Sequence, residues 1–399
     1  MRIAIVTEHV NRRGGQERVV AEVAERLSRY HEVHLFCFEA DPLKGERLTV
    51  HPVWCPFHSS SLEGLWILAS SLFFLRDPHF DAVISQGGNS LRQNFCVMHT
   101  CHALRAARTR DVEWRYHPPS FAKRLTQRLR ARLFLHFEGR AVKRCKGGVM
   151  TVSRFLKDYA MAQHGLSEED IHVTENGVDH ATFHPGLREH WRPLVREQLG
   201  IPEEAFVVLF VGGRWFDKGV PFLVEALRLM KDRQAHLVVV GKGDVGFFQD
   251  FAAQQGVADR LHLCPPTYEP QRYYASADCF GFPSDAEGFP LVIGEAASCG
   301  LPLIITPVGG AEHLVEEGVS GFIVQPDAAQ IADRLDQLAG DRERLAAMSD
   351  AVYRKSLKLS WDAQARAIMR VLEQRTGLGL GTSDLMAAAE ERSQGGDAR

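Results

Sequence analysis

Residues 280–305 of this chain read FGFPSDAEGFPLVIGEAASCGLPLII. An apolar strand leads through a turn into a helix, and a second apolar strand follows. Pro290 suits the first helical turn, because the missing N–H of proline has no helical partner to lose there. A strand, a helix and a strand in this order are typical of an α/β protein with a parallel sheet. We therefore expect that fold class for the chain.

The turn before this helix has the features of an anion site. The backbone N–H groups of Gly288, Phe289 and Leu291 are expected at the positive end of the helix, which favours a phosphate. Glu287 lies in the same turn, and Glu295 lies about two turns along the helix. A sugar nucleotide has an anionic diphosphate and donor hydroxyls. It therefore fits a seat that offers helix N–H groups and two carboxylates.

The glutamates at 287 and 295, with seven residues between them, resemble the paired-glutamate motif of retaining glycosyltransferases of family 4. The segments GLP at 300–302 and VGG at 308–310 extend the similarity. The resemblance implies a GT-B fold, in which two Rossmann-like domains with parallel sheets face each other across an interdomain cleft. It also implies that Glu287 contacts the donor sugar and Glu295 the nucleotide ribose. The alternative is an ordinary helix with exposed glutamates.

The length of 399 residues points to two domains. Prolines and glycines between residues 179 and 202 interrupt regular structure, so we place the linker there. We expect an acceptor-side domain at 1–185 and a nucleotide-sugar domain at 195–358. In the family, the last helix, here 361–375, packs back on the first domain. Residues 377–399 are rich in Gly, Ser, Ala and charge, and predict a flexible tail.

Apolar and amphipathic stretches alternate along both halves. Strands are expected at residues 3–7, 33–38, 82–85, 94–99, 148–152, 207–211, 237–240, 261–263, 279–283, 303–306 and 321–324. Helices are expected at residues 17–28, 121–143, 220–230, 247–255, 291–299 and 328–338.

The bulk composition is that of an ordinary globular protein. A net charge of −3 gives no overall attraction to nucleic acid. The eight cysteines form no Cys-x-x-Cys pair, which favours reduced thiols. The chain begins directly with a strand and has no signal-peptide pattern, so we expect a cytoplasmic protein. The apolar segment at 65–75 is too short to span a bilayer, and predicts a buried helix or, alternatively, a membrane-dipping segment.

A second strand-to-helix turn reads VGGRWFDKG at residues 211–219. The glycines, including Gly213, precede Arg214 and Lys218. Arginine binds a diphosphate with a bidentate fork, and lysine binds it as a point charge. By resemblance, both cations hold the donor diphosphate and stabilise the departing nucleotide. The alternative is a solvated loop with two cations.

A third turn, GKGDVG at residues 241–246, matches the dinucleotide pattern Gly-x-Gly-x-x-Gly. An NAD site would require an acidic residue at the end of the next strand, but Asp259 precedes that strand. We therefore interpret Gly241 as part of the nucleotide-facing turn, similar to a segment of the family, with NAD binding as the alternative. Residues 266–268, including Tyr268, are the predicted contact for the base.

The first half has two candidate acceptor-side sites. Gly14 and Gly15 open the first long helix and resemble the family's glycine loop, which faces the acceptor and the donor phosphate; the alternative is a turn for chain reversal. His99, His102 and Arg105 follow a strand, at the end where ligands bind in such sheets. By resemblance, His102 bonds the donor sugar. His99 is the alternative, and both could instead be core histidines.

Residues 123–146 contain nine Lys or Arg and one acid, Glu138, interleaved with leucine and phenylalanine. Such a basic helix can lie on an anionic inner membrane, within 121–146, or guide a charged acceptor. The alternative is a solvated basic face. The segment resembles the membrane-touching region of lipopolysaccharide core glucosyltransferases. Peripheral attachment to the cytoplasmic face of the membrane is therefore an expectation.

The sequence predicts a retaining glycosyltransferase (EC 2.4) that moves a sugar from a nucleoside-diphosphate donor, such as a UDP-sugar, to a hydroxyl of a glycan or glycolipid. The expected pathway is the biosynthesis of cell-surface polysaccharide or lipopolysaccharide. No metal-ligand pattern occurs, so we expect metal-independent transfer without a cofactor. The alternatives are a nucleotide-sugar epimerase of the same fold and a non-catalytic membrane-surface binding protein.

Overall fold

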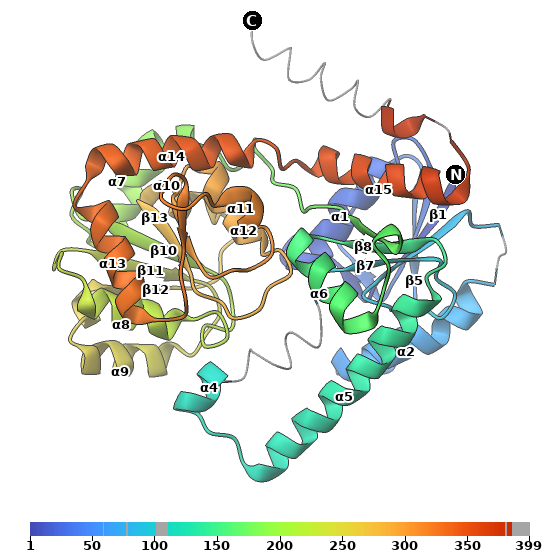
Figure 1. Cartoon of the computed structure of the whole chain (residues 1–399), viewed down its shortest axis with the longest axis horizontal. Coiled ribbons are helices and arrows are strands. Elements are labelled where there is room, and N and C mark those ends of the chain that lie inside the picture. The colour runs from blue at the N-terminus through green and yellow to red at the C-terminus, as the bar shows by residue number, and fades with distance from the viewer. Residues whose placement is uncertain (59, 77–78, 101–110, 380, 385–399) are drawn as a thin grey trace, which may run out of the picture. The chain divides into compact units, whose positions relative to one another are not determined.

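The computed structural model describes residues 1–58, 60–76, 79–100, 111–379 and 381–384. Contacts divide the chain into two compact units (Figure 1). Unit 1 comprises Met1–Leu104, Phe121–Gly177 and Ser360–Arg399, and unit 2 comprises Arg105–Ser120 and Val178–Leu359. The main change of unit therefore precedes residue 185, where we had placed the end of the first domain. A short segment of the first half also belongs to unit 2.

Unit 1 is built on a seven-stranded parallel sheet in the order β5-β3-β1-β6-β7-β8-β9. The strand order reverses beside β1, where Ile3 pairs with Val33 of β3 and with Ala82 of β6. The central strands are buried along nearly their whole length, as in sheets covered on both faces. The strands are β1 (Arg2–Val6), β3 (Glu32–Cys37), β5 (Leu48–Pro52), β6 (Ala82–Gln86), β7 (Phe95–Met98), β8 (Gly148–Thr151) and β9 (Ile171–Val173); β2 (His9–Val10) and β4 (Glu39–Ala40) form a separate pair.

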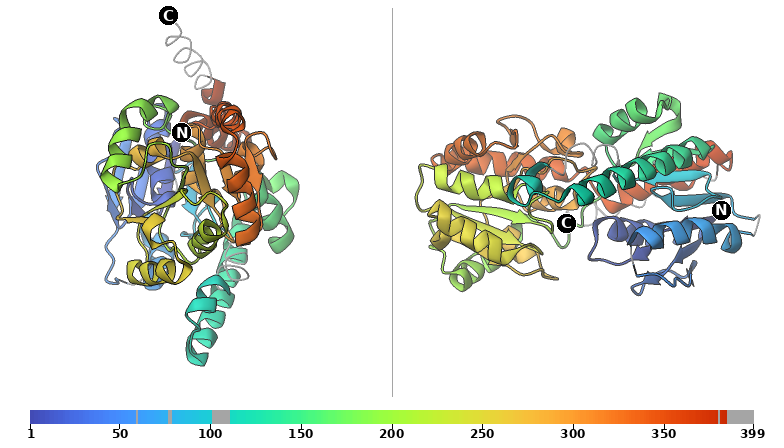
Figure 2. Two further views of the ribbon diagram at one scale, coloured as in Figure 1. Left: turned by 90° about the vertical axis from the view of Figure 1, so that its left-hand side faces the viewer. Right: turned by 90° about the horizontal axis from the view of Figure 1, so that it is seen from below.

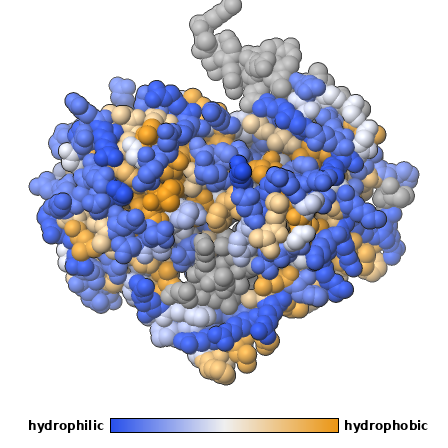
Figure 3. Space-filling view, in the orientation of Figure 1, coloured by the Kyte–Doolittle hydropathy of each residue, from blue (hydrophilic) through white to orange (hydrophobic). Residues whose placement is uncertain are grey.

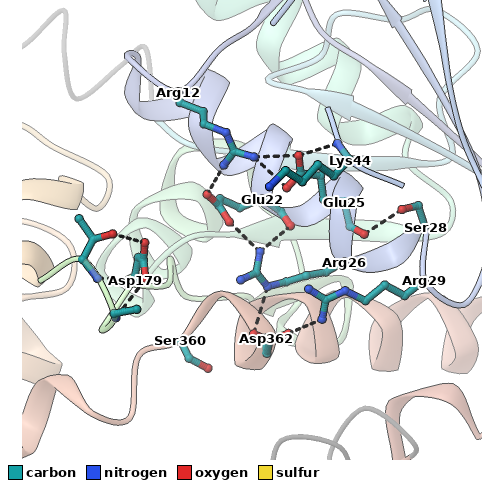
Figure 4. Close-up of polar contacts among 12 residues, drawn as sticks. Arg12, Glu22, Glu25, Arg26, Ser28, Arg29, Lys44, Asp179, Ser360 and Asp362 are labelled. Carbon is teal, nitrogen blue, oxygen red and sulfur yellow. Dashed lines mark hydrogen bonds and ion pairs between the residues drawn. The ribbon is translucent and has the colours of Figure 1, made fainter. Parts of the chain in front are cut away.

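The last long helix packs along the first one in unit 1 (Figure 4). The carboxylate of Asp362 lies 3.2 Å from Nε of Arg26 and 3.4 Å from Nη1 of Arg29. Buried apolar residues of the first helix, such as Val20 and Leu27, supply the packing beneath these ion pairs. The helices of unit 1 are α1 (Gly15–Leu27), α2 (Ser60–Phe74), α5 (Phe121–Arg144), α6 (Arg154–His164) and α15 (Trp361–Thr376), with the short turn η1 (Glu168–Asp170).

The helix α2 contains most of the apolar segment at 65–75, but it is only half buried. Ile67 packs in a core cluster with residues of β1, β3 and β6. Leu65, Leu72 and Phe73 are exposed. The prediction of a buried helix is therefore wrong for the outer face, because only one stripe of α2 meets the sheet. Among the described residues, no helix combines the length and apolar character that crossing a bilayer requires.

Unit 2 is built on a six-stranded parallel sheet in the order β12-β11-β10-β13-β14-β15. The helices α8 and α9 lie on one side of this sheet, and α11 and α14 lie on the other (Figures 1 and 2). The strands are β10 (Val207–Val211), β11 (His236–Val240), β12 (Leu261–Cys264), β13 (Cys279–Phe282), β14 (Leu303–Ile305) and β15 (Gly321–Ile323). The helices are α4 (Asp111–Tyr116), α7 (Arg188–Leu199), α8 (Val220–Leu229), α9 (Val245–Gln255), α10 (Gln271–Ser276), α11 (Leu291–Ser298), α12 (Ala311–Leu314), α13 (Ala328–Ala339) and α14 (Arg342–Ser356), with the short turns η2 (Pro185–Leu187) and η3 (Ala258–Arg260).

The helix α7 lies within residues 179–202, where the sequence predicted no regular element. Pro193 lies inside this helix. The side chain of Asp278 is fully buried. Its carboxylate binds three arginines of α7 at 2.8–3.0 Å: Arg188, Arg192 and Arg196. These charge-assisted contacts hold α7 against the entry of β13. They explain why a helix forms in spite of the proline.

The predicted strands are all present close to their expected bounds, and the α/β class with parallel sheets is confirmed. The sequence did not predict β5, β9, α6, α10 or α14. The strand β9 has three residues and lies at the sheet edge, where a short pattern carries little signal. In the segment expected to be a flexible tail, Thr382 and Ser383 are buried and donate hydrogen bonds to the carboxylate of Glu373.

Candidate functional site

The strand order of unit 2 reverses between β10 and β13. These neighbours pair through Val208 with Cys279 and through Leu209 with Phe280. In an open parallel sheet, ligands bind beyond the carboxyl ends of the strands at such a switch point. The loop at 212–219 leaves the carboxyl end of β10, and the loop at 283–290 leaves that of β13. The two predicted diphosphate loops therefore meet at one place.

The ammonium group of Lys218 lies between these two loops. Its Nζ is 3.6 Å from Oε1 of Glu287, and both side chains are 21% exposed. The same Nζ lies 5.3 Å from the ring centroid of Phe282 at the end of β13. The structure thus brings together a cation and a carboxylate that the sequence separates by about seventy positions. Both retain access to solvent.

Glycines let the loops after three strands approach one another. Gly219 has φ +78°, and a Cβ on it would lie 2.2 Å from the carbonyl oxygen of Pro283. Gly241 has φ +138°, and a Cβ there would lie 2.1 Å from the carbonyl oxygen of Gly212. Any larger residue would push the loops apart. The glycines therefore serve the assembly of the switch point, whatever ligand binds there.

Arg214 has a strained backbone. Its φ of 51° lies in the left-handed region, where non-glycine residues are uncommon. Its Nη2 lies 2.5 Å from Oδ2 of Asp217, and its side chain is 48% exposed. Burial raises the pKa of Asp217, whereas Arg214 lowers it. Asp217 was not predicted as a site residue, although an acid three residues after an arginine in a turn is a signal for an ion pair.

The loop at 283–290 is braced by the loop after β14. The N–H of Gly309 donates to the carbonyl of Glu287 at 3.1 Å. The ring of Phe289 is buried and packs against Gly310. Pro290 is the N-cap of α11, whose first residue is Leu291. The predicted donor-binding residues 288–291 therefore lead into this helix, and Gly288 is buried.

Glu295 lies deeper than Glu287. It is 7% exposed, and its Oε2 accepts a hydrogen bond from the hydroxyl of Tyr274 at 3.0 Å. Tyr274 on α10 was not predicted, because nothing in the local sequence indicates a contact between helices α10 and α11. Tyr268, in the loop after β12, is 76% exposed. Its ring is thus accessible at the carboxyl edge of the same sheet.

The turn at residues 241–246 has structural duties in unit 2. Gly213 lies close to the carbonyl of Lys242, and Gly243 seats the buried ring of Trp215. Asp244 caps α9 by accepting from the N–H of Phe247 at 3.1 Å. The strand β12 ends at Cys264, so the acid that NAD binding requires is lacking there. These residues do not fit a dinucleotide site.

The glycine turn of unit 1, here called the acidic turn, has Glu8, Glu17 and Glu63 beside it, together with Arg12 and Arg13 in the turn itself. The N–H groups of Arg13 and Gly14 donate to Oδ1 of Asn11 at 2.9 and 2.8 Å, which fixes the turn before Gly15. The carboxylate of Glu17 fills the space beside Gly14. Burial raises the pKa of Glu8 at the end of β1.

Two further carboxylates act on Glu8. The charges of Glu63 and Glu17 raise its pKa, and His9 lowers it. Glu8 was not predicted as a site residue, although a charged residue two positions after a buried first strand is the available signal.

His99 at the end of β7 is buried, and its Nε2 lies 2.6 Å from Oε1 of Gln86. Burial lowers the pKa of His99 to about 4, so the ring is neutral at physiological pH. His102 and Arg105 lie outside the described residues. Among the residues that are described, no group of three or more His, Cys, Asp or Glu is arranged to hold a metal ion.

The helix α5 of unit 1 exposes an apolar line beside arginines (Figure 3). Phe121 is 83% exposed, and Leu125, Leu129 and Leu133 follow it at intervals of four residues, all exposed. Each of these leucines is preceded by an arginine: Arg124, Arg128 and Arg132. The predicted combination of basic and apolar side chains is therefore present on the surface.

Two doubly wound parallel units, one with a lysine–glutamate pair at its switch point, define a protein of the Rossmann-type α/β class. Known families agree with this class. The pattern described as Glycosyltransferase Family 4 matches residues 13–182, and that described as Glycosyl transferases group 1 matches residues 192–355. A D-inositol 3-phosphate glycosyltransferase from Xylanimonas cellulosilytica is 34% identical over 224 residues, 53% of this chain and 53% of that protein. The chain thus spans about half the length of the curated relatives it matches.

Solved structures share the fold at low sequence identity. WaaG, a glycosyltransferase involved in lipopolysaccharide biosynthesis, has a TM-score of 0.75 at 19% identity, covering 94% of this chain and 100% of that chain. HepE from Anabaena in complex with UDP-glucose has a TM-score of 0.69 at 19% identity, with the same coverage of 94% and 100%. The chain belongs to glycosyltransferase family 4, and its fold is GT-B.

Proposed function

We propose that this protein is a retaining glycosyltransferase that moves a sugar from a UDP-sugar to a hydroxyl of a glycan or glycolipid. The observation that carries the proposal is the contact between Lys218 and Glu287 at the switch point of unit 2. A cation that binds a diphosphate and a carboxylate that binds sugar hydroxyls lie 3.6 Å apart there. A sugar diphosphate presents its two chemical parts at a similarly short separation.

The proposed mechanism is electrostatic. The bond between the anomeric carbon and the diphosphate breaks, its electron pair leaves with the diphosphate, and the acceptor oxygen bonds to the same face of the sugar. The acceptor proton passes to the leaving diphosphate. The developing negative charge is offset by Lys218, Arg214 and the start of α11. Such electrostatic stabilisation is usually the largest single contribution to catalysis. We propose that these groups make a metal ion unnecessary.

The two glutamates would have separate duties. Glu287, partly exposed beside Lys218, would orient the hydroxyls of the donor sugar. Glu295, held by the hydroxyl of Tyr274, would accept hydrogen bonds from the ribose. The exposed ring of Tyr268 would lie along the base. His102 retains its predicted contact with the donor sugar, because His99 already has a partner in Gln86.

The donor and the acceptor are supported by different observations. HepE, which shares the fold, binds UDP-glucose, and this favours a uridine nucleotide. WaaG, which shares the fold, is involved in lipopolysaccharide biosynthesis, and this favours a glycan or glycolipid acceptor. The name of the relative from Xylanimonas cellulosilytica indicates an inositol phosphate instead. The apolar and basic surface of α5 favours contact with an anionic membrane, where a lipid-linked acceptor would be found.

Calorimetry with UDP-, GDP-, ADP- and TDP-sugars tests the donor class. We expect the UDP-sugar to bind most tightly and free UDP to compete with it. Incubation of the preferred donor with hydroxyl acceptors, followed by NMR of the anomeric proton, should show a product with the donor's configuration. An inverted product would contradict the retaining mechanism. A changed sugar in the absence of any acceptor would identify an epimerase instead.

Sedimentation with lipid vesicles tests the contact of α5. We expect binding to vesicles that contain phosphatidylglycerol and not to pure phosphatidylcholine. The double variant Arg128→Glu and Arg132→Glu should lose this binding and retain UDP affinity. A protein that binds vesicles but takes up no nucleotide would be a non-catalytic membrane-surface protein.

A further inference from the structure

We infer that the helix α4 positions the diphosphate loop at 212–219, and that Tyr116 is a positioning residue for donor binding. This inference rests on the proposed function of that loop. It adds a segment from the first half of the chain to the machinery of unit 2. The segment contains neither the glutamate pair nor the predicted cations.

The placement of α4 is the first observation. The segment Arg105–Ser120 clusters with unit 2, although the chain on both sides of it belongs to unit 1. Of its described part, Val112 is buried at 7% exposure. The guanidinium of Arg115 lies 5.8 Å from the ring of Phe222 on α8. The helix is thus attached to unit 2 by side-chain packing rather than by proximity in the sequence.

An aromatic cluster joins α4 to the diphosphate loop. The ring of Tyr116 lies 5.9 Å from Phe216, 5.6 Å from Phe247 and 5.5 Å from Phe251, measured between centroids. The ring of His117 lies 5.1 Å from both Phe216 and Phe247. The contact of Tyr116 with Phe216 is tilted, and the other contacts of this cluster are edge-to-face. Aromatic pairs contribute about 0.5–1.5 kcal/mol each beyond the buried area. The partly buried ring of Phe216 is therefore in contact with rings at α4 and on α9.

The position of Phe216 in the loop gives this cluster its consequence. Phe216 lies midway between Arg214 and Lys218 in the sequence. Its neighbour Trp215 is buried on the inner side, where its indole N–H donates to the carbonyl of Gly212 at 3.0 Å. Two kinds of contact therefore hold the loop in place. Trp215 packs in the core of unit 2, and Phe216 packs against the aromatic cluster.

The strained backbone of Arg214 requires such support. A non-glycine residue in the left-handed region costs about 1–3 kcal/mol and persists where surrounding contacts impose it. Phe216, which makes the aromatic contacts, lies two residues after the strained Arg214. Loss of the ring of Tyr116 would let the loop relax and would move both cations from their places.

The hydroxyl of Tyr116 has a separate contact. It lies 3.1 Å from Oε1 of Glu225 on α8, to which it donates a hydrogen bond. Burial, followed by the charge of Glu225, raises the pKa of Tyr116 to about 12, so the phenol keeps its proton. The ring and the hydroxyl can thus be tested separately, because Tyr116→Phe removes only the second.

The experiment compares Tyr116→Ala with Tyr116→Phe in the full chain. We expect Tyr116→Ala to weaken UDP binding about tenfold by calorimetry, which corresponds to the loss of one or two ring contacts. Tyr116→Phe should bind UDP nearly as the original protein does. In turnover assays, Tyr116→Ala should raise the KM for the donor and leave the KM for the acceptor unchanged. A merely structural role would not raise the KM for the donor while leaving the KM for the acceptor unchanged.

Hydrogen exchange gives a readout that does not need a ligand. We expect faster exchange in peptides covering 212–219 in Tyr116→Ala, with the sheet of unit 2 unaffected. Phe216→Leu keeps an apolar side chain and should reproduce the effect if Tyr116→Ala folds poorly. Trp191→Ala is the control, because it removes an aromatic ring from α7, which packs on α10; we expect it to change neither UDP affinity nor exchange in the loop.

The outcomes separate the inference from the proposed function. Unchanged UDP affinity and unchanged loop exchange in Tyr116→Ala and Phe216→Leu would overturn the positioning role while leaving donor binding intact. An original protein that binds no nucleotide would overturn the proposed function. In that case, hydrogen exchange alone would still decide whether α4 orders the loop.

Discussion

The first strand-to-helix turns of the two units have the same place in the fold and opposite chemistry. Both follow the strand beside which the sheet order reverses, β1 in unit 1 and β10 in unit 2. In unit 2 this turn carries Lys218 and Arg214. In unit 1 the turn contains Arg12, which is paired with Glu22 and Glu25. Glu8 lies close enough to Glu17 and Glu63 for their charges to raise its pKa. The scaffold fixes where a ligand binds, and the local charges decide which ligand.

We expect the carboxylates of the acidic turn to disfavour a phosphate, although Arg13 lies in the same turn. Carboxylates accept hydrogen bonds and repel anions, so they match the hydroxyls of a sugar. The amides of Arg13 and Gly14 are already bonded to Asn11. Of the two ligands that the resemblance assigns to Gly14 and Gly15, the acceptor therefore fits this turn better than the donor phosphate. We therefore propose that the acidic turn of unit 1 binds hydroxyls and that unit 2 binds the diphosphate.

The largest effect is expected from Lys218→Ala. Hydrogen bonds to charged groups contribute about 1.5–3 kcal/mol, so the Kd for UDP should rise by roughly ten- to a hundredfold. The loss also leaves Glu287 without its cation, close to an anionic ligand. Calorimetry with UDP is the measurement, and Lys218→Arg should retain most of the affinity. Equal losses in Lys218→Ala and Glu8→Gln would remove the distinction between the two turns.

A smaller effect is expected from Arg214→Gly, which removes a cation and a strained backbone together. UDP affinity should fall several-fold, less than for Lys218, because the guanidinium is 48% exposed and already paired with Asp217. Glycine adopts φ of 51° freely, but it also adds about 0.4–1 kcal/mol of unfolded-state entropy. We therefore expect a nearly unchanged melting temperature.

Arg214→Ala is the matched control for that variant. It should lose the same affinity. Its free energy of unfolding should be about 0.5–1 kcal/mol lower than that of Arg214→Gly, because alanine keeps about 1–2 kcal/mol of strain and avoids only about 0.4–1 kcal/mol of glycine entropy. Equal stabilities would show that the left-handed conformation is not imposed on this residue in solution.

The contrast also shows what the sequence could predict. Buried strands followed by glycine turns predicted both sheets, and parallel sheets place every such turn at one edge. The family resemblance predicted that Lys218 and Glu287 belong to one donor site, and the pairing of β10 with β13 brings their loops together. The sequence did not predict roles for Tyr274, Asp217 and Tyr116. Their roles depend on side-chain contacts that the periodicity of the sequence does not encode. The prolines near α7 misled for a similar reason, since the stabilising carboxylate of Asp278 lies far along the chain.

Glu8→Gln tests the acidic turn. We expect the KM for the acceptor to rise several-fold with the Kd for UDP unchanged, because an amide is a weaker acceptor of hydroxyl hydrogen bonds than a carboxylate. A change in UDP affinity without a change in the acceptor KM would reverse the assignment of unit 1.

The stability of Glu8→Gln should depend on pH. The folded pKa of Glu8 is raised above its ordinary value of 4.5, chiefly by burial. The proton on Glu8 therefore contributes stability that is complete below 4.5 and is lost as the pH rises through the folded value. Glutamine has no proton to lose, so the variant should be more stable than the original at pH 7 and equal to it near pH 4. Urea unfolding at the two pH values measures this difference.

The smallest effect is expected from Asp362→Asn. This substitution removes the carboxylate of α15 that forms ion pairs with Arg26 and Arg29 (Figure 4). The side chain of Asp362 is 40% exposed, so the free energy of unfolding should fall by about 0.2–1 kcal/mol, and by less at high salt. Asp350→Asn, which breaks a more exposed pair with Arg354, is the control and should cost less. The acceptor KM should not change, because the buried apolar face of α1 holds the helix and its turn in place. A raised KM in Asp362→Asn would mean that surface charges, rather than packing, position the acidic turn.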